Sequence, residues 1–223
     1  VNVIGSTLSI DDTGGDCSTI GDWNSATKTC TLTLDFTSDS VGIVIASDGI
    51  TLDGNGHTIS GAGSSASQED WGVDAMHKDN FTIKNLNIEN FGLGIRTSHT
   101  PSGGTITGNT ISSNLLDGIY GESETALKIT NNIVTSNDRN GITIMGAYGN
   151  YNCASNLAFL VKENTVSSNA VNGIEFSGGE QGEVCFEQNT VNSNQNGFAI
   201  YNSQMAKFTN NISNLNSNYG FTF

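Results

Sequence analysis

Residues 109–119 read NTISSNLLDGI, and the same pattern returns as NIVTSNDRNGI at residues 132–142 and NTVSSNAVNGI at residues 164–174. Each copy has one asparagine, a second five residues later, and a glycine four residues after that. Further copies begin at Asn85 and Asn211, and a copy one residue shorter begins at Asn189. The leading asparagines are 24, 23, 32, 25 and 22 residues apart, a period typical of stacked supersecondary units.

Apolar and polar residues alternate around each asparagine pair, as they do in strands with one buried face. Three groups of apolar positions repeat, one after each glycine, one before each leading asparagine and one after it. The first group is Ile95, Ile119, Ile142, Ile174, Phe198 and Phe221; the second is Ile106, Ile129, Val161, Phe186 and Phe208; the third is Ile111, Val134, Val166, Val191 and Ile212. Three short strands per turn predict an all-β solenoid, a single-stranded parallel β-helix of about seven coils with almost no α-helix.

The repeated asparagines and glycines have a structural explanation. A side-chain amide both donates and accepts hydrogen bonds, so stacked asparagines can bond along a column, and asparagine tolerates a left-handed backbone. Glycine is expected where the chain needs a positive φ. We therefore interpret the Asn columns as part of the fold and not as a binding surface.

Residues 1–40 do not follow the repeat. Val1 to Ile10 and Thr31 to Phe36 alternate like strands, and a solenoid needs a cover for its first open edge. The sequence predicts an N-terminal β cap with a disulfide loop at residues 1–40 and a parallel β-helix at residues 41–223. The interval of 32 residues predicts an inserted loop near residues 146–155.

Two stretches resemble the opening turns of a known group. Residues 42–59, GIVIASDGITLDGNGHTI, and residues 79–88, DNFTIKNLNI, resemble right-handed parallel β-helix proteins of the pectin-lyase-like superfamily. The nearest likeness is to the repeat domains of NosD-like and carbohydrate-binding sugar-hydrolase surface proteins, and it covers about residues 41–223. The resemblance implies a right-handed coil. It does not select one activity, because lyases, hydrolases, epimerases, adhesins and maturation factors share this fold.

The charge balance limits the partners. The chain has 8 Lys plus Arg against 22 Asp plus Glu, for a net charge of −14. This acidity argues against nucleic acid and an anionic membrane surface as partners, and no apolar stretch is long enough for a membrane span. A polyanionic sugar would need calcium to bridge the charges. The acidic stretch at residues 67–70 could hold calcium, but no cofactor is expected.

Four cysteines without a Cys-x-x-Cys spacing favour two disulfides over zinc. Cys17 and Cys30 lie in a loop-like setting, and Cys153 ends the predicted insertion one coil before the outward-facing Cys185. These pairs predict an extracellular or cell-surface protein. Asn80 and Asn211 lie in Asn-x-Ser/Thr sequences and are candidate glycosylation sites.

The enzymes of the resembled superfamily work on the outer face of one sheet, but the polygalacturonase motifs are absent here. If this protein is an enzyme, Arg96, Glu122 and Glu175 are the candidate catalytic residues. Arg96 and Glu175 take equivalent outward positions three coils apart, with Tyr120 and Thr143 between them. Glu122 and Glu175 are two coils apart, so their carboxylates would be roughly 10 Å apart, at the limit of the ~6.5–9.5 Å used by inverting glycosidases. The alternative is a solvated face with scattered charge.

Other residue types suggest binding. Tyr120 and the inserted-loop residues Tyr148 and Tyr151 could contact a sugar ring or a protein, since tyrosine offers a large contact area. The alternative is an insertion with no role. His77 and His99 are expected on one corner of adjacent coils, but with His57 they form no clear ligand set, so no metal site is predicted.

The preferred function is a non-catalytic extracellular structural subunit that associates end to end with identical copies into a fibre or surface layer. The contact residues would be Val1, Val3, Ile4, Tyr219, Phe221 and Phe223. The alternative is a secreted polysaccharide lyase, hydrolase or epimerase, or a carbohydrate-binding surface protein. A related hypothesis is an ice- or crystal-surface binder with a column of Thr110, Thr165 and Thr190, interrupted by Ile133 and Asn211.

Overall fold

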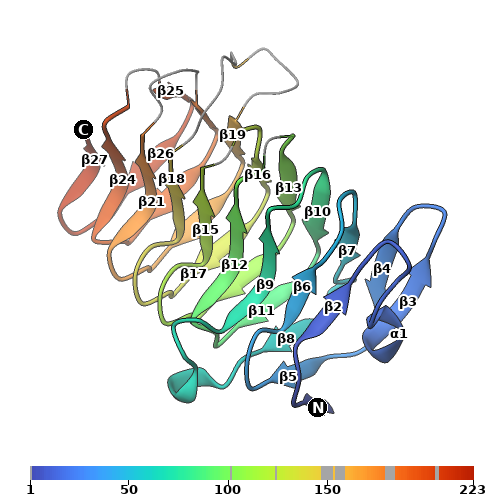
Figure 1. Ribbon diagram of the computed structural model, residues 1–223. Helices are drawn as coiled ribbons and strands as arrows, with labels where there is room; N and C mark the ends of the chain where they lie inside the picture. The colour runs from blue at the N-terminus through green and yellow to red at the C-terminus, as the bar shows by residue number, and fades with distance from the viewer. Residues whose placement is uncertain are drawn as a thin grey trace.

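The computed structural model describes residues 2–100, 102–123, 125–146, 153, 159–178, 184–203 and 206–223. The chain winds as a coil of three parallel sheets, and the two termini lie at opposite ends of the coil (Figure 1). The three sheets are called A, B and C, and their strands are given below. From β7 (Thr51–Asp53) to β27 (Tyr219–Thr222) the chain passes through sheet C, sheet A and sheet B seven times in the same order. The predicted solenoid of about seven coils is confirmed.

Each sheet has nine strands. Sheet A contains β1 (Asn2–Ile4), β5 (Phe36–Ser38), β8 (Thr58–Ser60), β11 (Asn87–Glu89), β14 (Thr110–Ser112), β17 (Ile133–Thr135), β20 (Thr165–Ser167), β23 (Thr190–Asn192) and β26 (Ile212–Asn214). Sheet B, which faces the viewer in Figure 1, contains β2 (Leu8–Ile10), β6 (Ile43–Ile45), β9 (Trp71–Met76), β12 (Leu93–Ser98), β15 (Ile119–Glu122), β18 (Ile142–Met145), β21 (Asn172–Ser177), β24 (Asn196–Tyr201) and β27 (Tyr219–Thr222). Sheet C contains β3 (Gly21–Asn24), β4 (Thr29–Leu32), β7 (Thr51–Asp53), β10 (Phe81–Lys84), β13 (Gly104–Thr107), β16 (Lys128–Thr130), β19 (Phe159–Lys162), β22 (Val184–Glu187) and β25 (Ala206–Thr209). The described residues also contain one α-helix, α1 (Cys17–Ile20), and one 3₁₀ turn, η1 (Gly63–Ser65).

The inward positions are those predicted, with one exception. Ile111, Val134, Val166 and Val191 pair in register and are buried, as expected of parallel strands that share one core. The prediction for Ile212 is wrong. Ile212 pairs with the outward Thr190 and is 49% exposed, while Ser213 takes the inward position. It is therefore Ile212, and not Asn211, that interrupts the threonine column.

Two columns of buried asparagine run along the coil. In each column the side-chain oxygen of one asparagine accepts hydrogen bonds from the backbone N–H and the side-chain amide of the asparagine one coil earlier. Asn132 does this for Asn109 at 3.0 Å for both bonds, and Asn137 does it for Asn114 at 3.1 and 2.8 Å. The columns are Asn109, Asn132, Asn164, Asn189 and Asn211, and Asn114, Asn137, Asn169, Asn194 and Asn216. These asparagines satisfy buried backbone groups, so their repetition serves the fold.

Two details of the repeat differ from the prediction. The first copy is offset by one residue, because Asn87 pairs with Thr110, so Leu86 and not Asn85 precedes Asn109 in the column. The left-handed backbone also falls one position early, at residues such as Asn131 and Ser136, just before the buried asparagines.

The repeated glycines are required by close approach and not by a positive φ. A Cβ on Gly118 would lie 2.4 Å from the Cγ1 atom of Val134 and 2.8 Å from the oxygen of Gly141. Contacts this short exclude any side chain, and Gly141 meets Val166 in the same way. The glycine column therefore lets each coil fold closely over the valine or isoleucine beneath it.

The N-terminal segment joins the coil directly. β1 and β5 belong to sheet A, β2 to sheet B and β4 to sheet C, all paired in parallel with later strands. β3 and β4 form an antiparallel hairpin at the end of sheet C. The division into a cap at residues 1–40 and a β-helix at residues 41–223 stays a prediction, but the strands on both sides of residue 40 are continuous.

Both predicted disulfides are confirmed. Cys17 bonds Cys30, with Cα atoms 5.8 Å apart, and Cys153 bonds Cys185, with Cα atoms 5.7 Å apart. Disulfides persist in oxidising environments, which agrees with a location outside the cytoplasm. Tyr148 and Tyr151 lie outside the described residues. No helix among the described residues is both long and apolar enough to cross a membrane.

Apolar side chains are exposed on the last coil. Tyr219 is 62% exposed and Phe223 81%, while Phe221 stacks on Phe198 with ring centroids 4.8 Å apart. Val3 is exposed near the other end. Val1 and the side chain of Ile4 lie outside the described residues. Association between copies at these ends stays a prediction.

Candidate functional site

The outer face of sheet B carries two columns of side chains that differ from coil to coil. In the first column, Asp74, Arg96, Tyr120, Thr143 and Glu175 pair in register on successive strands from β9 to β21. Two residues further along the same strands, the second column reads Met76, Ser98, Glu122, Met145, Ser177 and Tyr201. Successive members are about 4.8 Å apart, so neighbouring side chains can contact one ligand together.

Arg96 lies at the N-terminal end of this face. Its guanidinium carbon is 4.0 Å from the centre of the Trp71 ring, a cation–π contact, and its Nη2 atom donates to the sulfur of Met76 at 2.9 Å. Asp74, on the preceding strand, is only 8% exposed. Burial raises the pKa of Asp74, against the opposing effects of the Met76 N–H and Arg96. The region therefore holds one cation and one carboxyl group whose pKa is raised by burial.

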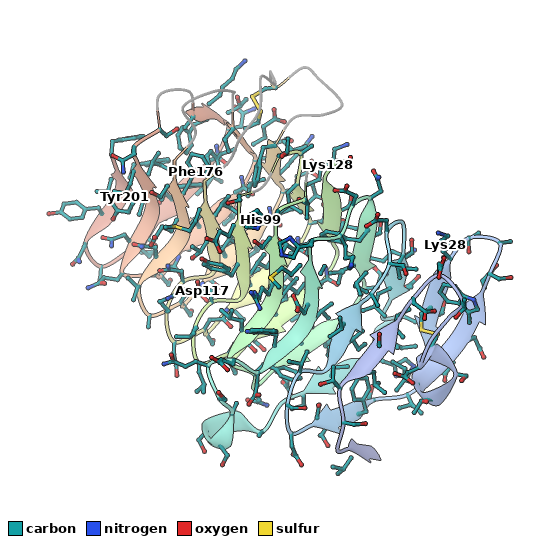
Figure 2. All side chains as sticks on the ribbon, viewed as in Figure 1. Lys28, His99, Asp117, Lys128, Phe176 and Tyr201 are labelled. Atoms are coloured by element: carbon teal, nitrogen blue, oxygen red, sulfur yellow. A yellow bond between two sulfur atoms is a disulfide. The ribbon has the colours of Figure 1, made fainter. Side chains whose placement is uncertain are left out.

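His77 and His99 lie at the corner where β9 and β12 end, as predicted. Their ring centres are 5.0 Å apart, and Nδ1 of His99 is 2.5 Å from the hydroxyl of Ser98. His99 and Asp117 are labelled in Figure 2, at the end of β12 and before the start of β15. His57 instead pairs with Asp35 at 2.9 Å. The described residues contain no group of three or more His, Cys, Asp or Glu that could hold a metal ion.

Tyr120 occupies the middle of the first column and is half-buried. Burial raises the pKa of its phenol, and the neighbouring Glu122 carboxylate raises it further. Tyr120 therefore remains a proton donor at neutral pH. Glu122 is exposed on the same strand and the same face.

A buried ion pair supports the next part of the face. Asp117 is fully buried and accepts hydrogen bonds from both Nε, at 2.6 Å, and Nη2 of Arg139. It also accepts the backbone N–H of Asn140 at 3.0 Å. The hydrogen bonds to Asp117 raise the pKa of Arg139 despite its partial burial. A bidentate pair of this kind fixes the plane of the guanidinium group.

A short ladder of polar side chains continues from Asp117. Asn140 accepts the backbone N–H of Asn172 at 2.9 Å, and Asn172 accepts the side-chain amide of Asn196 at 2.9 Å. The amides of Asn140 and Asn172 both donate to Oε2 of Glu175, at 3.0 and 2.7 Å. Glu175 is thus held in one orientation by two amides that are themselves fixed.

These groups surround a groove of about 380 Å3 lined by Tyr120, Arg139, Asn140, Thr143, Met145, Val171 and Glu175. We call it the Thr143 groove. Thr143 forms its floor, because it is smaller than its column neighbours Tyr120 and Glu175 and is only 3% exposed. The groove combines an aromatic ring, an arginine and an oriented carboxylate, which are groups that recognise hydroxyl-rich ligands.

The candidate residues lie on one face, but not as one compact set. Arg96, Tyr120 and Glu175 share the first column as predicted. Glu122 belongs to the second column, so it is offset from Glu175 by two coils and two residues, about 12 Å between Cα atoms. Four residues of this region were not predicted from the sequence: Asp117, Arg139, Asn140 and Asn172. The only signal was their place one or two residues before the repeated glycines, where the pattern varies.

The two candidate glycosylation sites differ in exposure. Asn80 is exposed, beside a hollow of about 230 Å3 on sheet C that is lined mainly by glycine, alanine and threonine with Lys128. Asn211 belongs to a buried column, where its oxygen accepts from Asn189 and its amide donates to Phe186. Glycosylation at either position stays a prediction.

A comparison with protein families agrees with the fold. The family described as "Right handed beta helix region" matches residues 35–158, which is more than half of the chain. The periplasmic alginate epimerase AlgG is similar over 82% of this chain, with 15% identity and a TM-score of 0.49. This chain covers 46% of AlgG, about half of its length. The A-module of the Azotobacter vinelandii mannuronan C-5 epimerase AlgE6 is similar over 97% of this chain and 69% of its own, with 15% identity and a TM-score of 0.48. No curated protein sequence matches this chain.

Proposed function

The chain belongs to the right-handed β-helix family, and we propose that it binds an extracellular polysaccharide along the outer face of sheet B. The observation that supports the proposal most strongly is the Thr143 groove, which Tyr120, Arg139 and Glu175 line together on the outer face of sheet B. A polysaccharide is an extended ligand, and the two columns offer successive polar contacts along the coil axis.

The side chains of this face suit sugar recognition. Aromatic rings stack on the apolar faces of sugars, and Tyr120 and Trp71 lie on the face and at its edge. Carboxylates accept hydrogen bonds from hydroxyl groups and guanidinium groups donate them. Glu175 and Arg139 are already fixed by other side chains, so little freedom is lost when a ligand binds.

Binding is tested by affinity electrophoresis and titration calorimetry against a panel of soluble neutral and acidic polysaccharides. The expected result is binding of at least one polymer, weakened by about tenfold or more in Tyr120→Ala. Thr165→Ala, on the outer face of sheet A, is the matched control and is expected to bind like the unchanged protein. Binding of no polymer, or equal losses in both variants, contradicts the proposal.

Catalysis on the bound polymer is a second candidate function. Arg96, Tyr120 and Glu122 lie on adjacent strands, and they combine a cation, a phenol that keeps its proton and an exposed carboxylate. Such a set can donate and accept protons at one sugar, as a lyase, a hydrolase or an epimerase requires.

Turnover is tested by product analysis for new reducing ends, unsaturated ends and inverted stereocentres. Tyr120→Phe keeps the ring but removes the proton, so it should retain binding and lose turnover. A polymer that binds but is returned unchanged by the protein as it exists would leave binding as the function and refute catalysis.

A further inference from the structure

We infer that the Thr143 groove is a sugar subsite that selects a neutral, hydroxyl-rich pyranose unit over a uronate. The inference rests on the proposed polysaccharide binding and adds the substrate class at one position. Tyr120 and Glu175 stand two coils apart, about 9.6 Å between Cα atoms, with the small Thr143 between them. The groove therefore has a floor and two walls along the coil axis.

Glu175 supplies an oriented hydrogen-bond acceptor. Both of its amide donors, from Asn140 and Asn172, bond to Oε2. An ionised carboxylate offers about four acceptor positions, so half of its capacity remains for a ligand. Because Asn140 and Asn172 are tied to each other by a bond of 2.9 Å, the carboxylate keeps its place without a ligand.

Arg139 supplies the opposing donors. A guanidinium group has five N–H donors, and Asp117 takes those on Nε and one on Nη2. The side chain of Arg139 is 42% exposed although its partner Asp117 is completely buried. Arg139 lines the groove, so its remaining donors are available to a ligand there, while Asp117 balances its charge. An acceptor from Glu175 and donors from Arg139 in the lining of one groove match neighbouring hydroxyl groups on one sugar ring.

The local charge decides between neutral and acidic sugars. Together, the charged groups at the groove, Asp117, Arg139 and Glu175, carry one negative charge. Two further charges lie nearby and outside the lining: Glu122 on the strand of Tyr120, and Arg96 beside Tyr120, which is held by Trp71 and Met76. No unpaired cation lines the groove, since all of its described lining residues apart from Arg139 are neutral or acidic. The carboxylate of a uronate would face Glu175 without a counter-ion, whereas the hydroxymethyl group of a neutral sugar would not.

The test compares polymers that differ only or mainly in the carboxylate. The probes are polygalacturonate with its fully methyl-esterified form, and mannuronan with β-mannan, each titrated against the full chain. The neutral member of at least one pair is expected to bind about tenfold or more tightly than the acidic member. In Glu175→Gln, which keeps the side-chain shape and both amide contacts, this ratio should fall by about threefold or more.

Glu89→Gln is the matched control, because it removes one negative charge from the outer face of sheet A and leaves the groove intact. It is expected to leave the ratio unchanged, which separates a local effect from the net charge of −14. Raised salt should also lower the ratio of neutral to acidic affinity for the unchanged protein, because salt screens the repulsion. This second measurement keeps the test valid if a variant fails to fold.

The outcomes separate the inference from the proposed function. Three results would contradict the subsite but not polysaccharide binding. They are equal or tighter binding of the acidic member, an affinity ratio that does not change with salt, and equal effects of Glu175→Gln and Glu89→Gln on that ratio. If no member of either pair binds, and the broader polymer panel fails as well, the proposed function falls and the subsite falls with it.

Discussion

Sheet A and sheet B are built from the same coils, but their outer faces differ. One outward column of sheet A reads Thr58, Asn87, Thr110, Ile133, Thr165, Thr190 and Ile212, and the other reads Ser60, Glu89, Ser112, Thr135, Ser167, Asn192 and Asn214. Glu89 is the single charged residue in these two columns. The corresponding columns of sheet B include Asp74, Arg96, Glu122 and Glu175. Where only the fold constrains a position, small polar and β-branched residues recur, and where they do not recur we expect chemistry.

The polar ladders show the same difference. The two buried asparagine columns repeat one residue type and bond mainly to backbone groups and to each other. The ladder beside sheet B begins with Asp117 instead, and it ends on outward groups, Arg139 and Glu175. One arrangement satisfies the backbone, and the other fixes side chains that a ligand can reach.

The largest effect on stability is expected in the buried asparagine columns. Asn132→Ala removes the acceptor of the Asn109 N–H and side-chain amide and the donor to the oxygen of Ile106. Each buried group left unsatisfied costs about 1–3 kcal/mol, so the free energy of unfolding should fall by about 3 kcal/mol or more. Urea unfolding measures it. Asn214→Ala, exposed on sheet A, should change it by no more than about 0.5 kcal/mol. Similar losses in the two variants would contradict the distinction between buried and outward asparagine.

Breaking the Asp117–Arg139 pair should have the next largest effect. Arg139→Ala leaves a buried carboxylate without its partner, and we expect a loss of about 2 kcal/mol, less than for a fully buried pair because water reaches the guanidinium group. The double variant Asp117→Asn with Arg139→Gln removes both charges and should lose less than Arg139→Ala alone. A double variant that is less stable than the single one would show that the pair, and not the orphaned charge, sets the stability.

Asp74 should make the protein less stable as the pH rises, as expected for a site residue that costs stability when it is charged. Burial raises the pKa of Asp74 above 3.8. Between the ordinary pKa and this raised pKa, the folded chain holds a proton that the unfolded chain has lost. The contribution of Asp74 to stability therefore falls as the pH rises through this range. Asp74→Asn should raise Tm at neutral pH, and the difference should disappear in acid. The difference in Tm between the two proteins is measured by thermal unfolding from acid to neutral pH.

Asp53 on sheet C provides a control of opposite sign. Burial alone would raise the pKa of Asp53, but hydrogen bonds from Asn85, Lys84 and the N–H of Asn55 lower it below 3.8. Its contribution is present above the ordinary pKa and is lost as the pH falls through the folded pKa, so Asp53→Asn should lower Tm at neutral pH. The same sign for both variants would contradict the assignment of Asp74 as a residue that costs stability.

The smallest effect concerns the apolar end of the coil. If copies associate there, Phe221→Ser with Phe223→Ser should reduce the concentration dependence of light scattering, with little change in polysaccharide binding on sheet B. Scattering that is independent of concentration in the unchanged chain would end the hypothesis of end-to-end association.

The repeat made the fold predictable because the same period sets which side chains point inward in every coil. The failures occurred where the residue type and the position in the repeat disagree. Ile212 lies directly after Asn211, as Thr190 lies directly after Asn189, so the repeat places Ile212 outward and Ser213 inward although isoleucine is apolar. Asn85 lies one residue before the buried column, because the buried Leu86 occupies the position at which its backbone N–H bonds to Asn109.

The candidate site was predictable in part. The column from Arg96 to Glu175 follows from the register, which the glycines set. The contact between Asp117 and Arg139 joins residues 22 positions apart through their side-chain conformations, and no spacing in the sequence reports these. The two amides on Glu175 likewise come from two different coils.

Hydroxyl-radical footprinting with a bound polysaccharide tests the central claim most directly, because it compares the Thr143 groove with other surfaces of the same molecule. Aromatic and sulfur-containing side chains react readily, so Tyr120 and Met145 report on the Thr143 groove. The aromatic Phe223 and the aliphatic Leu215, which reacts more slowly but is highly exposed, report on surfaces outside the groove. The account predicts that the polymer protects Tyr120 and Met145 and leaves Leu215 and Phe223 as reactive as before. Protection of Leu215 or Phe223 with no change at Tyr120 and Met145 would contradict it.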